Sequence, residues 1–524
     1  MPADGYLLKR ENIREIVYCW VKEVMTAVKR SSFSADFSTD ELCVLDLLVA
    51  ELNGAALRHV RAELHGDEVL TFPRETRLQR MARLAKEPHL PERWVRRFNV
   101  WSALLDSAAM REAAIVFLPT HPTHVGQQVP VADALGALGA DFIFVVQHEE
   151  VYRYLKDLGV RPVFAQKLWM REMTDGESKG RRLGERLSRI QQDVSYFPNL
   201  VGVDRKKLWD LLLVTIVRLF PTVCKNLALQ HAIRTTIQPR VILPGNVVTV
   251  EGRVAARLAQ RAGIVVDSIM HGAIGGGEPL DRENIGDKFF VFGESSRDEL
   301  VKMGVDPALP AVVGAPYLHR KLQRGRQPSD YLLKRLGLPA GAKIVLLLTS
   351  GPGHCTSIQH YTEIIESVLR ISEALPNIYF IAKLHQKDRR AYYEKIQTRL
   401  GRGRLRVFEY GKIKADIFSW LRISTAIITT TSTVALEAMT VHVPVITVDL
   451  KNEFMDVDFI DAGATIHVKT ELELAQAIVH IDGQTENHAA TMRRANAFIS
   501  RAFSNLEGDA AKCCAEIINS QAHN

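Results

Sequence analysis

The sequence predicts an α/β protein with two successive, doubly wound parallel sheets and a helical N-terminal extension. The prediction depends on the length of 524 residues, on short apolar runs that alternate with helical patterns from residue 113, and on a single interruption of that alternation. This length accommodates two large domains and an attachment. We expect a helical extension over 1–110, a first sheet domain over 111–326 with a helical insertion at about 170–235, a second sheet domain over 327–505, and a helical tail over 506–524.

The composition is that of a folded protein with a mild basic bias. Apolar residues make up 47% and charged residues 24%, which excludes disorder over most of the chain. The 67 Lys and Arg against 60 Asp and Glu give a net charge of +7, which suits anionic ligands such as nucleotides but is no nucleic-acid signature. Six scattered cysteines without a CxxC pair argue against a disulfide framework or a structural zinc site, and indicate reduced thiols in a cytosol.

No secretory signal or membrane-spanning segment is visible in the sequence. Residues 1–10 are polar, and no apolar run reaches about 18 residues. The nearest one, 208–224, is interrupted by Asp210, Arg218 and Pro221. We therefore expect a cytoplasmic protein, with any membrane contact peripheral to the inner membrane.

The extension over 1–110 has the apolar spacing of helices and carries no catalytic constellation. Residues 11–30 and a segment opened by Thr39 show this spacing, and 77–86 and 92–107 look helical and basic. Basic amphipathic helices serve as structural or partner-docking elements, or as faces that bind a membrane or an acceptor. Both interpretations stay open.

The first sheet domain begins where the hydrophobic period changes. Residues 113–119 form a short, fully apolar run, as expected of a buried parallel strand, and a polar loop rich in His and Gly follows over 120–128. The further strands are expected at 142–146, 159–163, 241–243, 265–270, 289–292 and 311–313, and the helices at 131–138, 149–158, 250–262 and 294–303.

A basic connector over 318–326 leads into the second sheet domain. Ligands of open parallel sheets bind beyond the carboxyl ends of the strands, so two facing sheets place the site in the cleft between the domains. The strands are expected at 343–348, 378–383, 405–408, 426–429 and 445–448, and the helices at 358–374, 392–400, 415–422, 434–439, 471–481 and 489–519.

A run of five hydroxyl residues, 429–433, is the strongest candidate for phosphate binding. It follows a buried strand and opens a helix, whose free N–H groups and dipole attract anions. One hydroxyl would be enough for N-capping, so Thr431, Ser432 and Thr433 are expected to bind the phosphates. Glu437 lies one turn inside the helix and could accept hydrogen bonds from ribose hydroxyls.

Two further loops of the second domain are candidate nucleotide-binding segments. Lys383 and His385 follow the strand at 378–383 and offer a cation and an imidazole to a diphosphate. Ser350 and Gly351 follow the strand at 343–348, where glycine permits close approach of the backbone to a ligand. Neither loop contains a P-loop or a GxGxxG motif.

Histidines at strand ends of the first domain are candidate catalytic groups. His121 and His124 could supply a general base near neutral pH, with Glu149 as a third choice, and His271 precedes a glycine-rich loop. A histidine pair also suits a metal, but no carboxylate or cysteine stands at ligand spacing. We therefore expect neither a metal nor a cofactor.

These segments together resemble the GT-B type glycosyltransferase superfamily, with two Rossmann-like domains, over about residues 111–505. TTTSTVALEAMTVHVPVITVD, over 429–449, is similar to its donor-binding segment, and KLHQ, over 383–386, resembles the His-Pro element of polysialyltransferase-like and glycerophosphotransferase-like enzymes, with Gln386 in place of Pro. MHGAIGG, over 270–276, looks like a loop of capsule and teichoic-acid enzymes that non-hydrolysing sugar epimerases share. VVGAPYLHR, over 312–320, is similar to their interdomain link.

The resemblance implies metal-independent transfer of a sugar from a nucleotide-activated donor to a saccharide or lipid-linked acceptor in surface-polysaccharide synthesis. It places the nucleotide on the second domain, with Lys383 or His385 offsetting leaving-group charge. His121 or His124 would deprotonate the acceptor, and His271 would act there or steady the donor phosphate. The cleft between the domains is expected to close around 318–326, so that water is excluded and does not hydrolyse the donor.

Three alternatives stay open. A non-hydrolysing UDP-sugar 2-epimerase has the same architecture but usually needs acidic residues in the cleft, of which the first domain offers few at strand ends. A CDP-glycerol-type glycerophosphotransferase would release nucleotide from CDP-glycerol and not from UDP-sugars. A non-catalytic scaffold would dock partners through 1–110 and bind no nucleotide.

Overall fold

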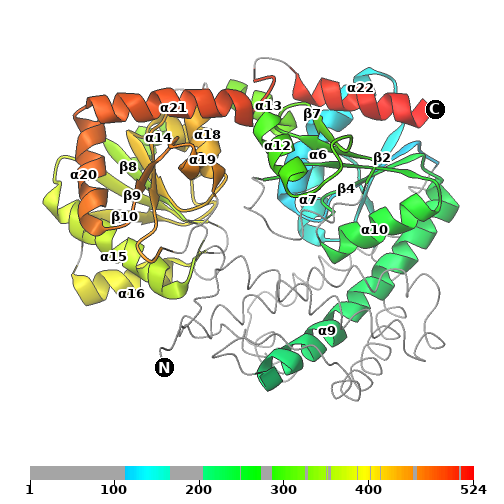
Figure 1. Cartoon of the computed structure of the whole chain (residues 1–524), viewed down its shortest axis with the longest axis horizontal. Coiled ribbons are helices and arrows are strands. Elements are labelled where there is room, and N and C mark those ends of the chain that lie inside the picture. Colours follow the sequence, from blue (N-terminus) through cyan, green and yellow to red (C-terminus); the bar gives the residue numbers. More distant parts are fainter. Residues whose placement is uncertain are drawn as a thin grey trace, which may run out of the picture.

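A computed structural model gives the fold of the chain (Figure 1). The expected helices over 1–110 lie outside the described residues, as does most of the helical insertion. The structure describes residues 112–165, 205–247, 249–272, 286–324, 329–349, 351, 356–385, 388–401, 403–413, 415–452, 457–506 and 509–523.

The first sheet has seven strands, all paired in parallel, in the order β3-β2-β1-β4-β5-β6-β7. Ile115 of β1 pairs with Phe142 of β2 on one side and with Val241 of β4 on the other, so the strand order reverses at β1. The strands are β1 (Ile115–Leu118), β2 (Phe142–Val146), β3 (Val163–Phe164), β4 (Val241–Pro244), β5 (Val265–Ile269), β6 (Lys288–Val291) and β7 (Pro310–Val312).

The second sheet has six parallel strands in the order β10-β9-β8-β11-β12-β13, and its order reverses at β8. Continuous burial of β8, β11 and β12 explains why these segments contain only apolar residues and threonine. The strands are β8 (Ile344–Leu348), β9 (Tyr379–Lys383), β10 (Leu405–Phe408), β11 (Ala426–Thr429), β12 (Val445–Val448) and β13 (Ile466–Val468).

Helices flank both sheets, which gives the doubly wound α/β architecture that the sequence predicts (Figure 1). Those of the first half are α6 (Pro122–Ala137), α7 (Glu149–Asp157), α9 (Arg205–Ala232), the π-helical turn η3 (Ile233–Ile237), α10 (Val250–Arg261), α12 (Glu294–Lys302) and α13 (Pro316–Arg324). Those of the second are α14 (Ser329–Leu336), α15 (Ile358–Ala374), α16 (Arg390–Leu400), α17 (Ile417–Arg422), α18 (Val434–Thr440), α19 (Asp458–Asp461), α20 (Glu471–Asp482), α21 (Glu486–Ala502) and α22 (Ala510–His523).

The structure departs from the predicted elements in two places that affect the site. The prediction of a polar loop over 120–128 is wrong, because α6 begins at Pro122, with His121 as its N-cap. Proline suits the first helical turn, where its missing N–H is not needed. The segment over 318–326 was expected to be a connector, but most of it belongs to α13. The predicted tail helix over 489–519 is also two helices, α21 and α22.

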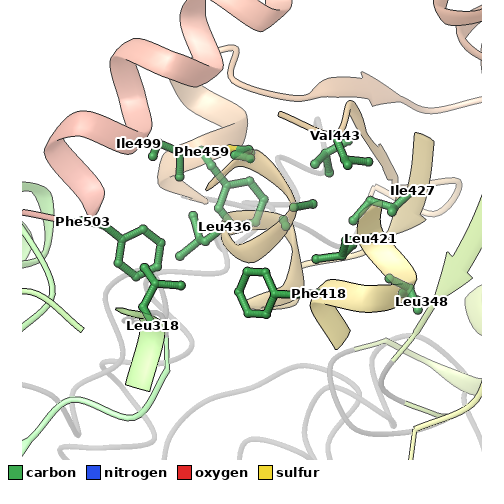
Figure 2. Packing of buried hydrophobic residues seen from close by; sticks show 14 of the residues in the cluster. Leu318, Leu348, Phe418, Leu421, Ile427, Leu436, Val443, Phe459, Ile499 and Phe503 are labelled. Carbon is green, nitrogen blue, oxygen red and sulfur yellow. The ribbon is translucent and has the colours of Figure 1, made fainter. Parts of the chain in front are cut away.

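One hydrophobic cluster joins the two halves. Figure 2 shows Leu318 of α13 beside Phe503, Phe418 and Leu436 from the second half. Phe292, after β6, belongs to the same cluster. The rings of Phe292 and Phe503 stack with centroids 5.5 Å apart. Because this apolar contact continues the core of the second sheet, the two halves are packed firmly against each other.

The last helix returns to the first half. α21 lies along the second sheet, and α22 then packs against α6 and β4 (Figure 1). Its buried face contributes Ala511, Cys514, Ala515 and Ile518 to the core of the first sheet. The first core is therefore built from two segments that are far apart in the sequence.

Two searches of the described residues have negative results. None of their helices combines the length and the hydropathy needed to cross a bilayer. None of their His, Cys, Asp and Glu side chains form a group of three or more that could hold a metal ion.

Candidate functional site

The carboxyl ends of the two sheets bring the His271 loop and the hydroxyl loop together. Gly272 follows β5 in the first half, and Thr433 precedes α18 in the second. A Cβ atom built on Gly272 would lie 3.5 Å from the Thr433 hydroxyl. The hydroxyl run thus faces the other half of the molecule, at the position where ligands of such folds bind.

Three of the predicted histidines form a cluster at the ends of β1 and β5. The ring of His124 lies edge-on to His271, with centroids 5.0 Å apart, and 6.0 Å from the ring of His121. The strand order places these loops side by side, although His124 and His271 are distant in the sequence. The cluster lies next to the contact between Gly272 and Thr433.

His124 is a buried, neutral member of the cluster. Burial, reinforced by repulsion from His271 and His121, lowers its pKa from 6.5 to about 3. Its Nδ1 lies 3.3 Å from the N–H and 3.2 Å from the hydroxyl of Thr120, and its Nε2 lies 3.3 Å from the Asn246 side-chain amide. Because the ring is buried and its Nδ1 accepts from the Thr120 N–H, His124 is better suited to hold the loops than to accept a substrate proton.

Asn246, after β4, connects His124 to the start of α10. Its Oδ1 accepts a hydrogen bond from the Thr249 N–H at 3.0 Å, which leaves the amide nitrogen to face His124. The glycine at position 252 makes this turn possible. A Cβ atom there would lie 1.6 Å from the Asn246 carbonyl oxygen.

Replacing Gly252 with alanine should therefore shift the Asn246 backbone and destabilise the protein by about 1–3 kcal/mol, the usual cost of overpacking. Thermal unfolding measures this loss. Gly126→Ala is the matched control, because a Cβ atom at that helical position meets nothing within 4 Å and alanine favours a helix. A Gly252→Ala midpoint equal to that of the unmodified protein would contradict the steric argument.

His121 is oriented by its position as N-cap of α6. Its Nδ1 accepts a hydrogen bond from the Thr123 N–H at 3.3 Å and lies 2.9 Å from the Thr123 hydroxyl. With Nδ1 accepting, the neutral ring carries its proton on Nε2. The Nε2–H of the neutral His121 ring is therefore the group that can act as a hydrogen-bond donor, since the Thr123 contacts use Nδ1.

His271 combines access with a neutral ring. Its side chain retains an exposed surface, yet surrounding protein desolvates the ring and, with repulsion from His121, lowers its pKa below the ordinary value. An imidazole that stays unprotonated at neutral pH can accept a proton. Among the three clustered histidines, His271 has the best properties for a general base.

A second polar group adjoins the cluster and was not found from the sequence. His148, after β2, has a pKa lowered by burial and then by Lys225 of α9, while Glu251 of α10 acts in the opposite direction. Burial lowers the Lys225 pKa as well. The only sequence signal was the position of His148 at a strand end, since Lys225 lies in the insertion that was predicted to be helical but was given no functional role. Glu149, the third predicted base, begins α7 beside this group.

Glu437 is held by residues of α13. Its side chain is 13% exposed, with the Lys321 ammonium 3.7 Å away, and it accepts a hydrogen bond from the Tyr317 hydroxyl. Burial raises the Glu437 pKa, an effect that Lys321, Tyr317 and Lys383 oppose. The sequence prediction found Glu437 and Lys383 but missed Lys321 and Tyr317, which come from the segment expected to be a connector.

Lys383 ends β9 as the sequence predicts. It is half-buried, and burial lowers its pKa, with the nearby Glu437 and Lys321 acting in opposite senses. Its ammonium also lies 5.8 Å from the centre of the Tyr410 ring. Two lysines thus flank one carboxylate, and the local surplus of positive charge favours an anionic ligand.

The remaining predicted residues lie in three loops of the second half. His385, in the first of them, follows β9 and is half-buried. Thr431, Ser432 and Thr433 are half-buried, and the Ser432 hydroxyl accepts a hydrogen bond from the Val434 N–H at 3.4 Å. Gly351 is buried with φ +85°, a conformation that favours glycine. Its neighbour Ser350 lies outside the described residues.

The fold is shared with nucleotide-sugar enzymes of known structure. The UDP-GlcNAc 2-epimerase from Neisseria meningitidis, bound to UDP-GlcNAc, has 13% identity and a TM-score of 0.51, over 78% of this chain and 98% of that one. The UDP-GlcNAc 2-epimerase from Methanocaldococcus jannaschii has 14% identity and a TM-score of 0.50, over 78% and 99%. A glycosyltransferase from Rickettsia africae ESF-5 has 13% identity and a TM-score of 0.50, over 79% and 99%.

At these identities the comparisons show the architecture, which is the GT-B-like α/β fold with two sheet domains. A model of the UDP-N-acetylglucosamine 2-epimerase family also matches residues 283–509, which contain Lys383, the hydroxyl run and Glu437. This match covers less than half of the chain. No curated protein matches the sequence.

Proposed function

We propose that the chain is an enzyme that binds a UDP-sugar between its two sheets and inverts the configuration at C2 of the sugar. The observation that carries the proposal is the family match over 283–509, the half that holds the predicted nucleotide-binding residues. The approach of Gly272 to Thr433 supports it, because it brings the histidine cluster beside that half. Epimerisation, an alternative in the sequence prediction, therefore ranks before glycosyl transfer.

The nucleotide would lie on the second domain. Thr431, Ser432 and Thr433 would donate hydrogen bonds to its phosphates, and Lys383 would offset their charge. Glu437 would accept hydrogen bonds from the ribose. The sugar would then extend toward His271, across the contact between the two halves.

The histidine cluster could supply the chemistry of inversion. Removal of the C2 proton would be balanced by loss of UDP from C1, which leaves a C1=C2 double bond. Protonation of C2 on the opposite face, with return of UDP to C1, would then invert the configuration, so the site needs one group that accepts a proton and one that donates. Neutral His271 would accept the C2 proton, and His121 in its protonated form would donate one. His124 would hold both loops in place.

Incubation with UDP-GlcNAc in D2O tests the proposal. Epimerisation should give the C2 epimer with deuterium at C2, which proton NMR detects as loss of the H2 signal and of its coupling. Retention of the substrate with its C2 proton intact would overturn the proposal.

Glycosyl transfer is the second candidate, favoured by a specific feature of the cluster. The groups that shift the pKa of His124 and His271 include histidines but no carboxylate. A single neutral base suffices to deprotonate an acceptor hydroxyl, whereas epimerases of this fold usually use acidic residues. The acceptor would be a saccharide or lipid-linked sugar in surface-polysaccharide synthesis, reached by peripheral membrane contact if it is lipid-linked.

Assays with other substrates separate the candidate functions. UDP release that requires an added saccharide acceptor, without a C2 epimer, would favour transfer. Nucleotide release from CDP-glycerol and not from UDP-sugars would favour glycerophosphotransfer. Failure to bind UDP, CDP and CMP by calorimetry would favour a non-catalytic scaffold.

A further inference from the structure

A buried hydroxyl–carboxylate network lies behind the nucleotide-binding loops of the second domain. The Tyr361 hydroxyl of α15 donates to the Asp388 carboxylate at 2.5 Å, and the Tyr393 hydroxyl of α16 lies 3.3 Å from the same oxygen. The two tyrosine hydroxyls are 2.9 Å apart, and Thr349 Oγ1 lies 3.3 Å from that of Tyr393. Both tyrosines are fully buried.

The network joins two loops that the sequence assigned to nucleotide binding. Thr349 ends β8, immediately before the segment of Gly351. The Asp388 N–H donates to the His385 carbonyl at 2.9 Å, which closes the turn that follows Lys383. Asp388 therefore ties the His385 turn to the end of β8, through side chains of α15 and α16.

Core packing alone does not require such a network. Two buried tyrosines could pack equally well as phenylalanines, and a buried polar network is stabilising only when its members are satisfied. Here the shared partner is a carboxylate on a loop and not on the core. The hydroxyls consequently fix the position of that loop.

We propose that Asp388, Tyr361 and Tyr393 are positioning residues that hold the His385 turn and the end of β8 in the arrangement that binds the nucleotide diphosphate. The inference rests on the proposed function, because it assumes that these loops bind a nucleotide. None of the three residues needs to touch the ligand. Their effect reaches it through His385, Lys383 and Gly351.

The neighbouring Tyr392 provides a matched control. Its hydroxyl is hydrogen-bonded to Thr362, so it also links α16 to α15. The described contacts of this hydroxyl do not include Asp388 or Thr349. Tyr392→Phe and Tyr393→Phe thus each remove one hydroxyl between the same two helices, and only Tyr393→Phe removes one from the loop anchor.

Calorimetric titration of the full-length protein with UDP tests the inference, together with thermal unfolding without ligand. Tyr393→Phe should weaken UDP binding roughly tenfold, the effect of about one lost hydrogen bond, while Tyr392→Phe should bind within about twofold of the unmodified protein. Asp388→Ala should weaken binding at least as much. Asp388→Asn should restore most of the affinity, because its carbonyl oxygen can still accept from Tyr361.

Hydrogen exchange provides a readout that does not depend on the ligand. Exchange of the segment around His385 should accelerate in Tyr393→Phe and not in Tyr392→Phe. Suppose that the unmodified protein binds UDP, and that Tyr392→Phe and Tyr393→Phe have the same UDP affinity, whether unchanged or reduced. The positioning role is then wrong and the proposed function stands. If the unmodified protein binds no nucleotide, both are wrong.

Discussion

Replacing His271 with glutamine should reduce turnover of the UDP-sugar by about 10²–10⁴-fold, the usual contribution of a general base. Glutamine keeps a polar side chain at the position but cannot accept a proton at neutral pH. The nucleotide-binding residues are unchanged, so UDP affinity should stay close to that of the unmodified protein. Turnover by NMR and UDP titration separate the two effects.

The pH dependence of turnover should also show that His271 acts as the base. The base acts when unprotonated, so activity should rise with pH through the pKa of His271. Because desolvation lowers that pKa, the acid limb should lie below pH 6.5. An acid limb above the ordinary histidine value would contradict this assignment.

His480→Gln is the control for His271→Gln, because it makes the same change on an exposed face of α20 in the second half. It should leave turnover unaltered. Full activity in His271→Gln would remove this histidine from the mechanism, and His121 would then be the remaining candidate base.

Replacing Asp267 with asparagine should change the free energy of unfolding in a pH-dependent way. The stability of the variant relative to the unmodified protein should be higher at pH 8 than at pH 5. The carboxyl of Asp267, in β5, is fully buried, and burial raises its pKa from 3.8 to about 7. Its Oδ1 accepts a hydrogen bond from the Gln521 amide of α22 at 3.3 Å, whereas the described residues provide no side-chain hydrogen-bond partner for Oδ2. Ionising this group at alkaline pH therefore places a poorly compensated charge beneath α22.

Proton linkage gives the direction in which stability changes with pH. The folded state binds the proton more tightly than the unfolded state, so the stability contributed by the neutral carboxyl is present below pH 3.8 and is lost as pH rises toward 7. A shift of about three units corresponds to roughly 4 kcal/mol, an upper figure for the pH-dependent part. Asparagine cannot ionise, so its advantage should grow over this range.

Thermal unfolding between pH 5 and pH 9 measures the effect. Asp157→Asn, an exposed position at the end of α7, is the control and should show no pH-dependent difference. Parallel stability profiles for Asp267→Asn and the unmodified protein would show that Asp267 is ionised normally in the folded state. The comparison depends only on the change with pH, so a constant packing offset does not affect it.

The sheet architecture was predictable because burial on both faces forces continuous apolar runs. β1, β8, β11 and β12 have every residue buried, and each consists only of apolar residues and threonine. β13 was missed, because it is only three residues long and includes His467. The edge strand β7 is equally short but was predicted, because its residues are all apolar.

The site was predictable where its residues follow strands, and not where partners come together by folding. His121, His271, Lys383 and the hydroxyl run were found at strand ends. The segment that carries His124 was predicted to be a loop, because its proline-containing helix start has the composition of one. Its partner Asn246 is 122 residues away in the sequence, and no local pattern connects them.

The return of α22 to the first half has a consequence for synthesis on the ribosome. The first sheet and its helices end near residue 324, but the apolar strip that α22 covers stays open until residues 510–523 have been translated. At about 5–20 residues per second, this delay is roughly 10–40 s. Throughout that interval the nascent first half exposes an aggregation-prone surface, so a trigger-factor-like holding chaperone would be most useful to this chain before its last helix emerges.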